Sequence, residues 1–117
     1  MNKHKATAWV GEADFEAKVL RSKQPVLVAF WAPWSRPCHI IDSVLDEVAA
    51  ACAGSVKVVK INADNHPALS LLYEIASIPA LLIFVDGTVR KKIVGTASTE
   101  AILATLHGLS PEPKPRK

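Results

Sequence analysis

Apolar residues along the chain fall into two kinds of run, which predict alternating strands and helices. An unbroken apolar run rich in β-branched residues occupies positions 25–32, and the segments 55–62 and 80–86 show a similar pattern. Such runs are typical of strands that are buried on both faces of a sheet. The pair Asp86-Gly87 then predicts a tight turn into a further strand at 88–95. A weaker first strand is expected at 5–10.

The segments between these strands repeat apolar residues at helical spacing. We expect helices over 12–22, 38–54, 67–75 and 98–108. Pro67 suits a first helical turn, Ser98 can cap the last helix, and Gly54 can end the second. Because strands and helices alternate, the pattern predicts an α/β fold with a central mixed β-sheet flanked by helices on both faces.

Length and composition are those of a small folded domain. The chain has 117 residues, of which 50% are hydrophobic and 21% charged, so a packed core is expected rather than disorder. We predict one domain over 1–109 and a flexible, proline-rich tail over 110–117. No apolar run approaches the roughly 20 residues that cross a bilayer, and the N-terminus lacks the apolar segment of a signal peptide. We therefore expect a cytoplasmic protein that does not bind membranes.

The distribution of charge and of metal-ligating residues excludes two function classes. The net charge of +3 comes mainly from basic residues near both ends of the chain, and no basic stripe is available to follow the phosphates of a nucleic acid. The run at 89–93 carries three basic residues and is expected to protect a sheet edge. Four scattered histidines and two cysteines form no zinc pattern. We expect a monomer without metal or other cofactor.

The candidate chemistry lies at Trp34-Ser35-Arg36-Pro37-Cys38, between a predicted buried strand and a predicted helix. Cys38 and Cys52 lie fourteen residues apart on that helix, which separates them by about 21 Å. This distance is far beyond the roughly 7 Å Cα limit for a disulfide. Both thiols should therefore be free within the molecule.

Four segments occur in an order that resembles the thioredoxin family. They are "VLVAFWAPWSRPC", "VKINADNHP", "IPALLIFVDG" and "IVGTAS", and the resemblance covers positions 9–109. It implies the thioredoxin fold and the family activity of protein-disulfide reduction. It also implies protein substrates that are presented as extended segments, and a thioredoxin reductase as partner if position 35 is natively cysteine.

The resemblance carries roles to individual positions. Cys38 matches the resolving cysteine of the family's W-C-G-P-C motif, and Pro79 matches the cis-proline that faces it. Backbone beside that proline holds the substrate segment in the family, and the glycine matched by Gly95 lets the substrate approach closely. The matched substrate-binding residues are Trp34, Arg36, Pro37, Ile78, Pro79 and Gly95, supported by Trp31, Ala29 and Lys60.

Several positions depart from the family pattern. Disulfide exchange requires a thiolate that attacks a substrate sulfur, but Ser35 occupies the attacking position. Ala29 replaces a buried aspartate, so Lys60 is expected to lack its carboxylate partner, and Arg36 replaces the glycine of the motif. As written, the chain is not expected to run dithiol–disulfide exchange.

Three functions remain open at this point. The first is a redox-inactive, holdase-like protein that binds protein segments in the cis-proline groove. The second is an ordinary thioredoxin disulfide reductase with an engineered Cys-to-Ser change at Ser35. The third is a single-cysteine redox sensor that acts through Cys38. Ser35 itself suits a helix N-cap and could also donate a hydrogen bond to Cys38, which is either an inert buried thiol or a reactive one.

Overall fold

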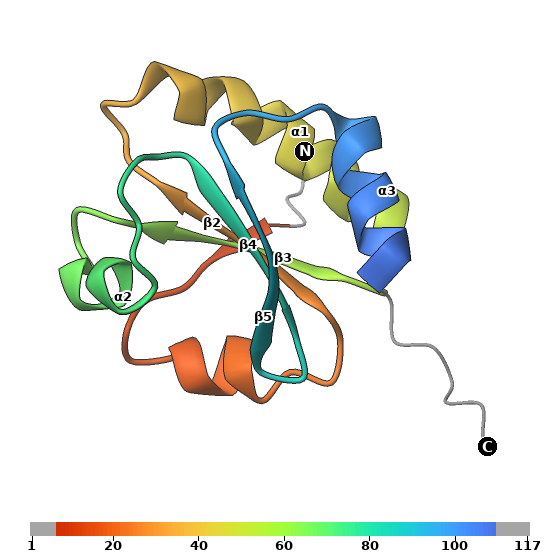
Figure 1. The fold of residues 1–117 in the computed structure, drawn as a ribbon, viewed down its shortest axis with the longest axis horizontal. Helices are drawn as coiled ribbons and strands as arrows, with labels where there is room; N and C mark the ends of the chain where they lie inside the picture. Colours follow the sequence, from red (N-terminus) through yellow and green to blue (C-terminus); the bar gives the residue numbers. More distant parts are fainter. Residues whose placement is uncertain (1–6, 110–117) are drawn as a thin grey trace, which may run out of the picture.

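The computed structural model describes residues 7–109, which form a five-stranded mixed sheet with helices on both faces (Figure 1). The order across the sheet is β1-β3-β2-β4-β5. Neighbouring strands β1, β3 and β2 run parallel, whereas β4 is antiparallel to β2 and β5 is antiparallel to β4. The predicted sheet is therefore confirmed, while the predicted tail at 110–117 lies outside the described residues. The strands are β1 (Thr7–Trp9), β2 (Val26–Trp31), β3 (Lys57–Asn62), β4 (Ala80–Val85) and β5 (Thr88–Val94).

Helices α1 (Arg36–Cys52) and α3 (Thr99–Leu109) cover one face of the sheet. The other face is covered by α2 (Pro67–Leu72) and by η1 (Glu16–Leu20), a short π-helical segment. The helix expected over 12–22 is thus only five residues long. Ser22 explains part of this difference, because its hydroxyl bonds both the amide and the carbonyl of Gln24 and so competes with helical backbone pairing.

The ends of the elements follow local sequence signals. The Ser98 hydroxyl accepts a hydrogen bond from the Ala101 amide at 3.1 Å, as an N-cap should. Helix α1 ends at Cys52, just before the expected Gly54, and Ala53 rather than the glycine is its left-handed cap with φ 50°. Asp86 and Gly87 both have positive φ, at 53° and 79°, and this pair of angles makes the tight hairpin between β4 and β5.

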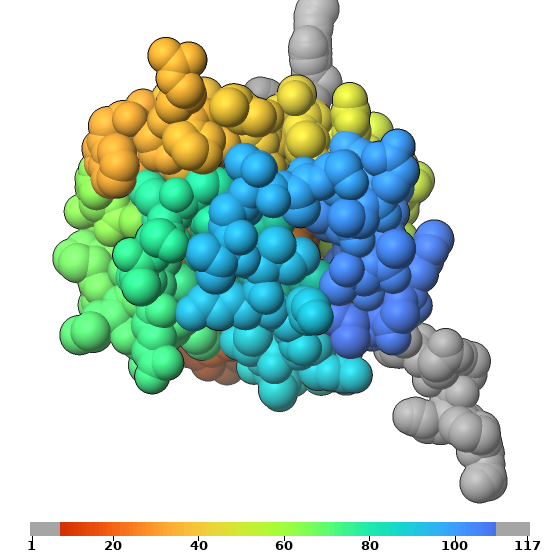
Figure 2. All heavy atoms as spheres, turned by 45° about the horizontal axis from the view of Figure 1, so that its top comes forward, coloured from red at the N-terminus to blue at the C-terminus, as the bar shows by residue number. Residues whose placement is uncertain are grey.

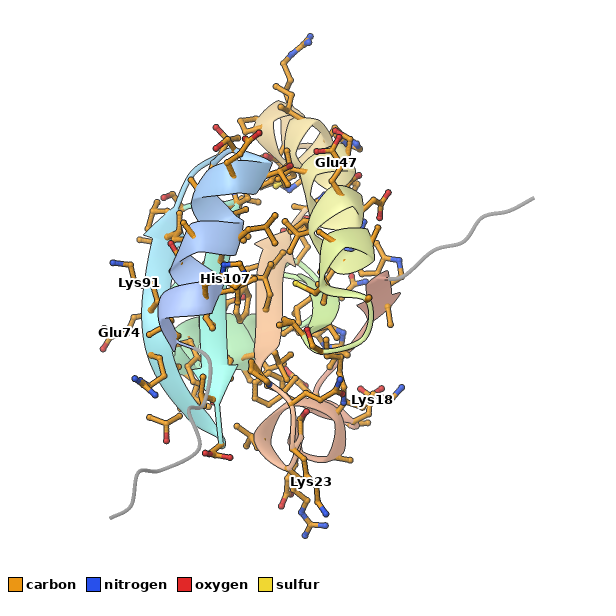
Figure 3. All side chains as sticks on the ribbon, turned by 90° about the vertical axis from the view of Figure 1, so that its right-hand side faces the viewer. Lys18, Lys23, Glu47, Glu74, Lys91 and His107 are labelled. Atoms are coloured by element: carbon orange, nitrogen blue, oxygen red, sulfur yellow. The ribbon has the colours of Figure 1, made fainter. Side chains whose placement is uncertain are left out.

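Two apolar cores lie on the two faces of the sheet. Strands β2 and β4 are buried at every residue, and alternate residues of each strand point to opposite faces. Figure 3 shows side chains filling the space on both sides of the sheet. The core under α1 and α3 includes Leu27, Ala29, Ile41, Leu45, Val48, Leu81, Ile83, Ile102 and Leu106. The core under η1 and α2 includes Phe15, Val19, Val28, Phe30, Ile61, Leu69, Leu82 and Phe84.

Strand β5 forms the exposed edge of the sheet. Six of its seven residues are exposed, and Lys91 points outward in Figure 3. Lys92 donates a hydrogen bond to the Glu74 carbonyl at 3.0 Å. The prediction of a lysine-protected edge at 89–93 is confirmed. Within residues 7–109, no helix has the length and apolar character that a bilayer crossing requires.

Candidate functional site

The loop between β2 and α1 places Ser35 at the N-cap of α1. Ser35 has extended backbone angles, φ −91° and ψ 115°, and is almost completely buried. Its Oγ accepts a hydrogen bond from the Cys38 amide at 3.2 Å. The described residues show no hydrogen bond between Ser35 Oγ and the Cys38 sulfur. Of the two contacts expected for Ser35, the structure therefore contains the cap, which satisfies an otherwise unpaired amide of the first turn.

Cys38 lies on the inner face of the first turn of α1. Its side chain is fully buried and its thiol is free. The Cys38 carbonyl accepts a hydrogen bond from Trp31 Nε1 at 3.0 Å, which ties the start of the helix to the end of β2. Cys38 is thus buried, as one of the two interpretations of this thiol expects.

Cys52, at the last residue of α1, is also free and is half-buried. Burial raises the pKa of the Cys52 thiol above its usual value, because desolvation disfavours the thiolate. The two cysteines do not pair, as their separation on α1 predicts.

Trp34 forms one wall of a groove beside the start of α1. The Trp34 side chain is 70% exposed, yet its Nε1 donates a hydrogen bond to Asp64 Oδ2 at 2.8 Å. A depression of about 500 Å³ lies against this ring, lined also by residues of 63–70 and by the segment 75–78. The indole is thus held in one orientation while most of its surface stays available for contact.

The opposite part of the site is built around Pro79. The Ile78–Pro79 peptide bond is cis, and the Pro79 carbonyl accepts a hydrogen bond from the Gly95 amide at 2.8 Å. Gly95 has a φ of 91°, and a Cβ there would meet no atom within 4 Å. The positive φ, rather than crowding, therefore favours glycine at this position. Figure 2 shows the orange start of α1 bordering the green segment that leads into β4.

Arg36 and Pro37 form the exposed outer surface of the first turn of α1. Arg36 makes no ion pair with any residue that the structure describes. Pro37 occupies an early helical position, where its missing N–H leaves no backbone hydrogen bond unmade. Within 7–109, no group of three or more histidine, cysteine or acidic side chains could hold a metal ion.

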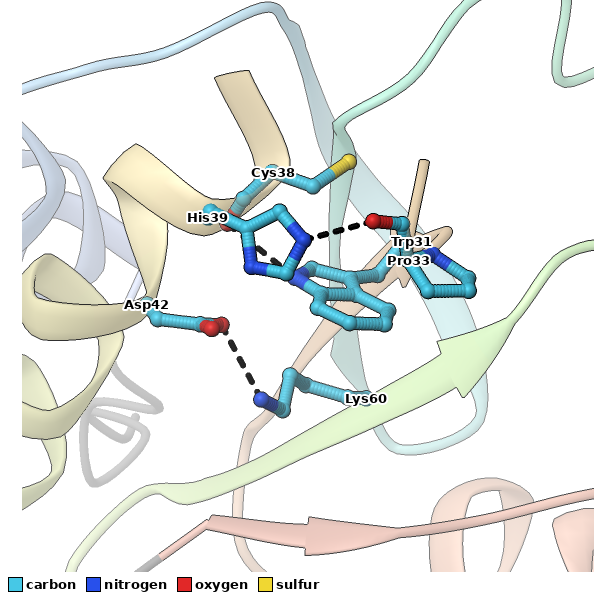
Figure 4. A network of polar contacts seen from close by, with 6 residues as sticks. All are labelled: Trp31, Pro33, Cys38, His39, Asp42 and Lys60. Carbon is cyan, nitrogen blue, oxygen red and sulfur yellow. Dashed lines mark hydrogen bonds and ion pairs between the residues drawn. The ribbon is translucent and has the colours of Figure 1, made fainter. Parts of the chain in front are cut away.

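The expectation that Lys60 lacks a carboxylate partner is wrong. Ala29 on β2 is fully buried and lies beside Lys60 on β3, so no acid reaches Lys60 from that strand. Instead, Asp42 reaches it from α1, with Asp42 Oδ1 at 3.0 Å from Lys60 Nζ (Figure 4). Sequence reasoning missed Asp42, although its position four residues after Cys38 places it one helical turn further along α1.

Aromatic rings surround this ion pair. Lys60 Nζ lies 4.7 Å from the centre of the Trp9 ring and 5.1 Å from that of Trp31, within the range of cation–π attraction. The Trp9 and Trp31 rings meet edge to face at 5.2 Å. His39 packs on Trp31 at 5.1 Å, and its Nε2 donates a hydrogen bond to the Pro33 carbonyl at 2.6 Å. In Figure 4 the Cys38 sulfur points away from these groups.

Comparison with known proteins agrees with this geometry. The sequence profile of the Thioredoxin family matches residues 6–108. The chain is 44% identical over 99 residues to thioredoxin 1 of Synechococcus elongatus, covering 85% of this chain and 92% of that protein. It is 44% identical over 102 residues to a thioredoxin of Synechocystis sp., covering 87% and 95%. It is 40% identical over 106 residues to the thioredoxin of Mycobacterium tuberculosis, covering 91% of each. The chain belongs to the thioredoxin family.

Proposed function

We propose that this protein binds extended protein segments in the cis-proline groove and does not exchange disulfides. The cis-proline groove is the depression that Trp34 and the segment 75–78 line next to Pro79. The observation that carries the proposal is the state of Ser35. Its hydroxyl cannot supply the thiolate that disulfide exchange requires, and its oxygen already accepts a hydrogen bond from the Cys38 amide. Cys38 is fully buried, so a substrate disulfide has no direct access to the remaining thiol.

The groove itself retains the features that binding requires. The exposed Trp34 ring and the side chains of Ile75 and Ile78 provide apolar contact along the depression. Neither the N–H nor the C=O of Ile78 bonds another residue within 7–109, so both can pair with an extended segment. Backbone pairing of this kind supplies affinity, while the neighbouring pockets select side chains.

Suppression of aggregation tests this role directly. The full chain is mixed with heat-denatured citrate synthase, and light scattering is followed over time. The chain should delay aggregation, and Trp34→Ser should weaken the effect because it removes the exposed ring. Val89→Ser is the matched control, since Val89 is also exposed but lies at the hairpin end of β5, away from Pro79. Equal suppression by both variants, or none by the native chain, would contradict the proposal.

A second function is favoured by the high identity to proteins named thioredoxin. In this alternative the chain is a thioredoxin disulfide reductase in which serine replaces cysteine at Ser35, and a thioredoxin reductase is its partner. The native coding sequence at codon 35 decides the matter. A natural serine codon eliminates the alternative, and a cysteine codon establishes it.

The third function, a redox sensor acting through Cys38, gains no support from its buried thiol. We further propose that the protein acts as a monomer in the reducing cytoplasm, which is consistent with two free thiols. Sedimentation of the full chain tests the monomer, and fractionation of the source cells tests the compartment.

A further inference from the structure

A second depression, with a volume of about 390 Å³, lies apart from the cis-proline groove and shares no lining residue with it. We propose that this depression binds a small, uncharged, planar heteroaromatic molecule that carries a ring carbonyl or a carboxamide. The proposal does not depend on the protein-binding function, because the two depressions are separate.

The depression lies where the parallel strands end. Its walls come from the end of β1 and the residues after it, from the end of β2, and from the end of β3 and the loop that follows. The chain leaves β2 toward α1 on one face of the sheet and leaves β3 toward α2 on the other. Adjacent parallel strands whose connections leave to opposite faces create a crevice at their carboxyl ends, and ligands of α/β proteins bind at such crevices.

Two tryptophans give the depression an aromatic wall. The Trp9 side chain is 52% exposed, whereas Trp31 is buried behind it. Trp9 is held in place by edge-to-face contact with Trp31 and by the Lys60 ammonium group. Pro33 adds a further apolar surface. The volume falls near the lower end of the range of about 300–1,000 Å³ for ligand pockets, so one ring system fits better than a peptide.

Polar groups on the β3 side define the chemistry of the ligand. Asn62 Oδ1 accepts a hydrogen bond from the Asp64 amide at 3.0 Å, which orients the side chain and leaves its NH₂ group to donate. The Asn65 carboxamide is exposed and can both donate and accept. The lining contains no carboxylate, ammonium or guanidinium group. Amide groups in a lining that itself carries no charged side chain match a neutral ring with a carbonyl acceptor.

His66 supplies a polar atom that the fold does not satisfy. Its Nδ1 is buried and has no hydrogen-bond partner among the described residues, a condition that costs about 1–3 kcal/mol in a folded protein. The imidazole packs so closely on Gly11 that a Cβ there would lie 2.5 Å from the ring. The Gly11 amide in turn donates to Asp14 Oδ1 at 2.8 Å. The imidazole therefore lines the depression from a loop that these contacts hold in place, and a rotation of the ring would bring its unpaired nitrogen to the depression.

The test is a titration of the ¹⁵N-labelled full chain with nicotinamide, uridine and inosine, followed by amide chemical shifts. Toluene and benzoate serve as comparison compounds, because one lacks a polar group and the other is charged. The variants are Trp9→Leu, which removes the exposed ring, and Asn62→Asp, which keeps the acceptor for Asp64 but removes the NH₂ donor. Trp34→Leu changes a residue that lines only the other groove and is the control. Dispersion of the amide spectrum verifies that each variant is folded.

We expect saturable shifts around Gly11 and Asn65 with at least one heteroaromatic probe at millimolar concentration. Loss of one hydrogen bond should weaken binding to Asn62→Asp by about tenfold. Loss of stacking should weaken binding to Trp9→Leu by at least about fivefold, and Trp34→Leu should bind like the native chain.

The proposal is overturned if no heteroaromatic probe gives saturable shifts, or if toluene or benzoate binds as tightly as the best of them. It is also overturned if Trp9→Leu and Asn62→Asp both retain native affinity, or if the shifts cluster at the cis-proline groove and disappear in Trp34→Leu.

Discussion

Replacing Lys60 by methionine removes the ammonium group from the cluster behind the site while it keeps an unbranched apolar chain. The ammonium group lies 3.0 Å from Asp42 Oδ1 and within 4.7 and 5.1 Å of the Trp9 and Trp31 ring centres. These contacts join β1, β2, β3 and α1. Lys60→Met should therefore destabilise the fold.

The size of the loss follows from distance and exposure. At 3.0 Å and an effective dielectric constant of about 20, the Coulomb attraction is about 5.5 kcal/mol before desolvation is counted. The Lys60 side chain is 14% exposed and that of Asp42 is 34% exposed, so both desolvation and screening by water reduce this value. We expect a net coupling of about 1–2 kcal/mol, between exposed and fully buried pairs. The cation–π contacts add about 1 kcal/mol, which gives a total of about 2–3 kcal/mol and a drop in Tm of roughly 10 °C.

Urea unfolding of Lys60→Met, Asp42→Asn and the double variant measures this coupling. The double variant should lose about 1–2 kcal/mol less than the sum of the single losses. The exposed pair Arg21–Glu16, at 3.4 Å, is the control cycle and should couple by less than about 0.5 kcal/mol. A Lys60–Asp42 coupling no larger than the control value would refute the argument.

Three further outcomes are expected. Ser35→Ala should lower the free energy of unfolding by about 1 kcal/mol because it removes the cap. Ser35→Asp should retain most of this stabilisation, because a carboxylate can also accept the hydrogen bond. Equal urea midpoints for Ser35→Ala and the unchanged chain would contradict this. Iodoacetamide should label Cys52 before Cys38, because Cys38 is fully buried, and peptide mass spectrometry gives this order. The labelling rate at Cys52 should keep rising at pH values above the ordinary thiol pKa, since burial raises the pKa of the Cys52 thiol. The pKa of Asp14 is lowered from 3.8, chiefly by the hydrogen bond from the Gly11 amide. The stability that the ionised Asp14 contributes is therefore complete above pH 3.8 and is lost as the pH falls through the lowered pKa. In urea titrations at acidic pH, Asp14→Asn should reduce this loss of stability.

Most of the fold follows from the sequence because its signals are local and strong. The β-branched runs that became β2 and β4 are long enough to be recognised as buried strands. The caps at Ser35 and Ser98 and the hairpin at Asp86-Gly87 each depend on one or two residues. The segment 12–22 was less predictable, because Ser22 pairs with the backbone two residues later in place of a further helical turn.

The arrangement of the candidate site was predictable where it depends on a motif and not where it depends on packing. The motif placed Ser35 and Cys38 at the start of a helix, as the structure has them. The partner of Lys60 was missed because Asp42 comes from a different element, and only the packing of α1 on the sheet brings them to 3.0 Å. The crevice beside Trp9 was missed for the same reason, since three loops contribute to it.

Reduction of insulin by the chain with Ser35 and by Ser35→Cys, with dithiothreitol as the electron source, tests the central claim most directly. The claim is that the chain exchanges no disulfides because serine replaces the attacking thiol at position 35, and that the departures at Ala29 and Arg36 do not by themselves abolish the activity. It predicts that the chain with Ser35 gives the rate of the protein-free control, whereas Ser35→Cys accelerates insulin precipitation. Acceleration by the chain with Ser35, or an inactive but folded Ser35→Cys variant, would contradict it.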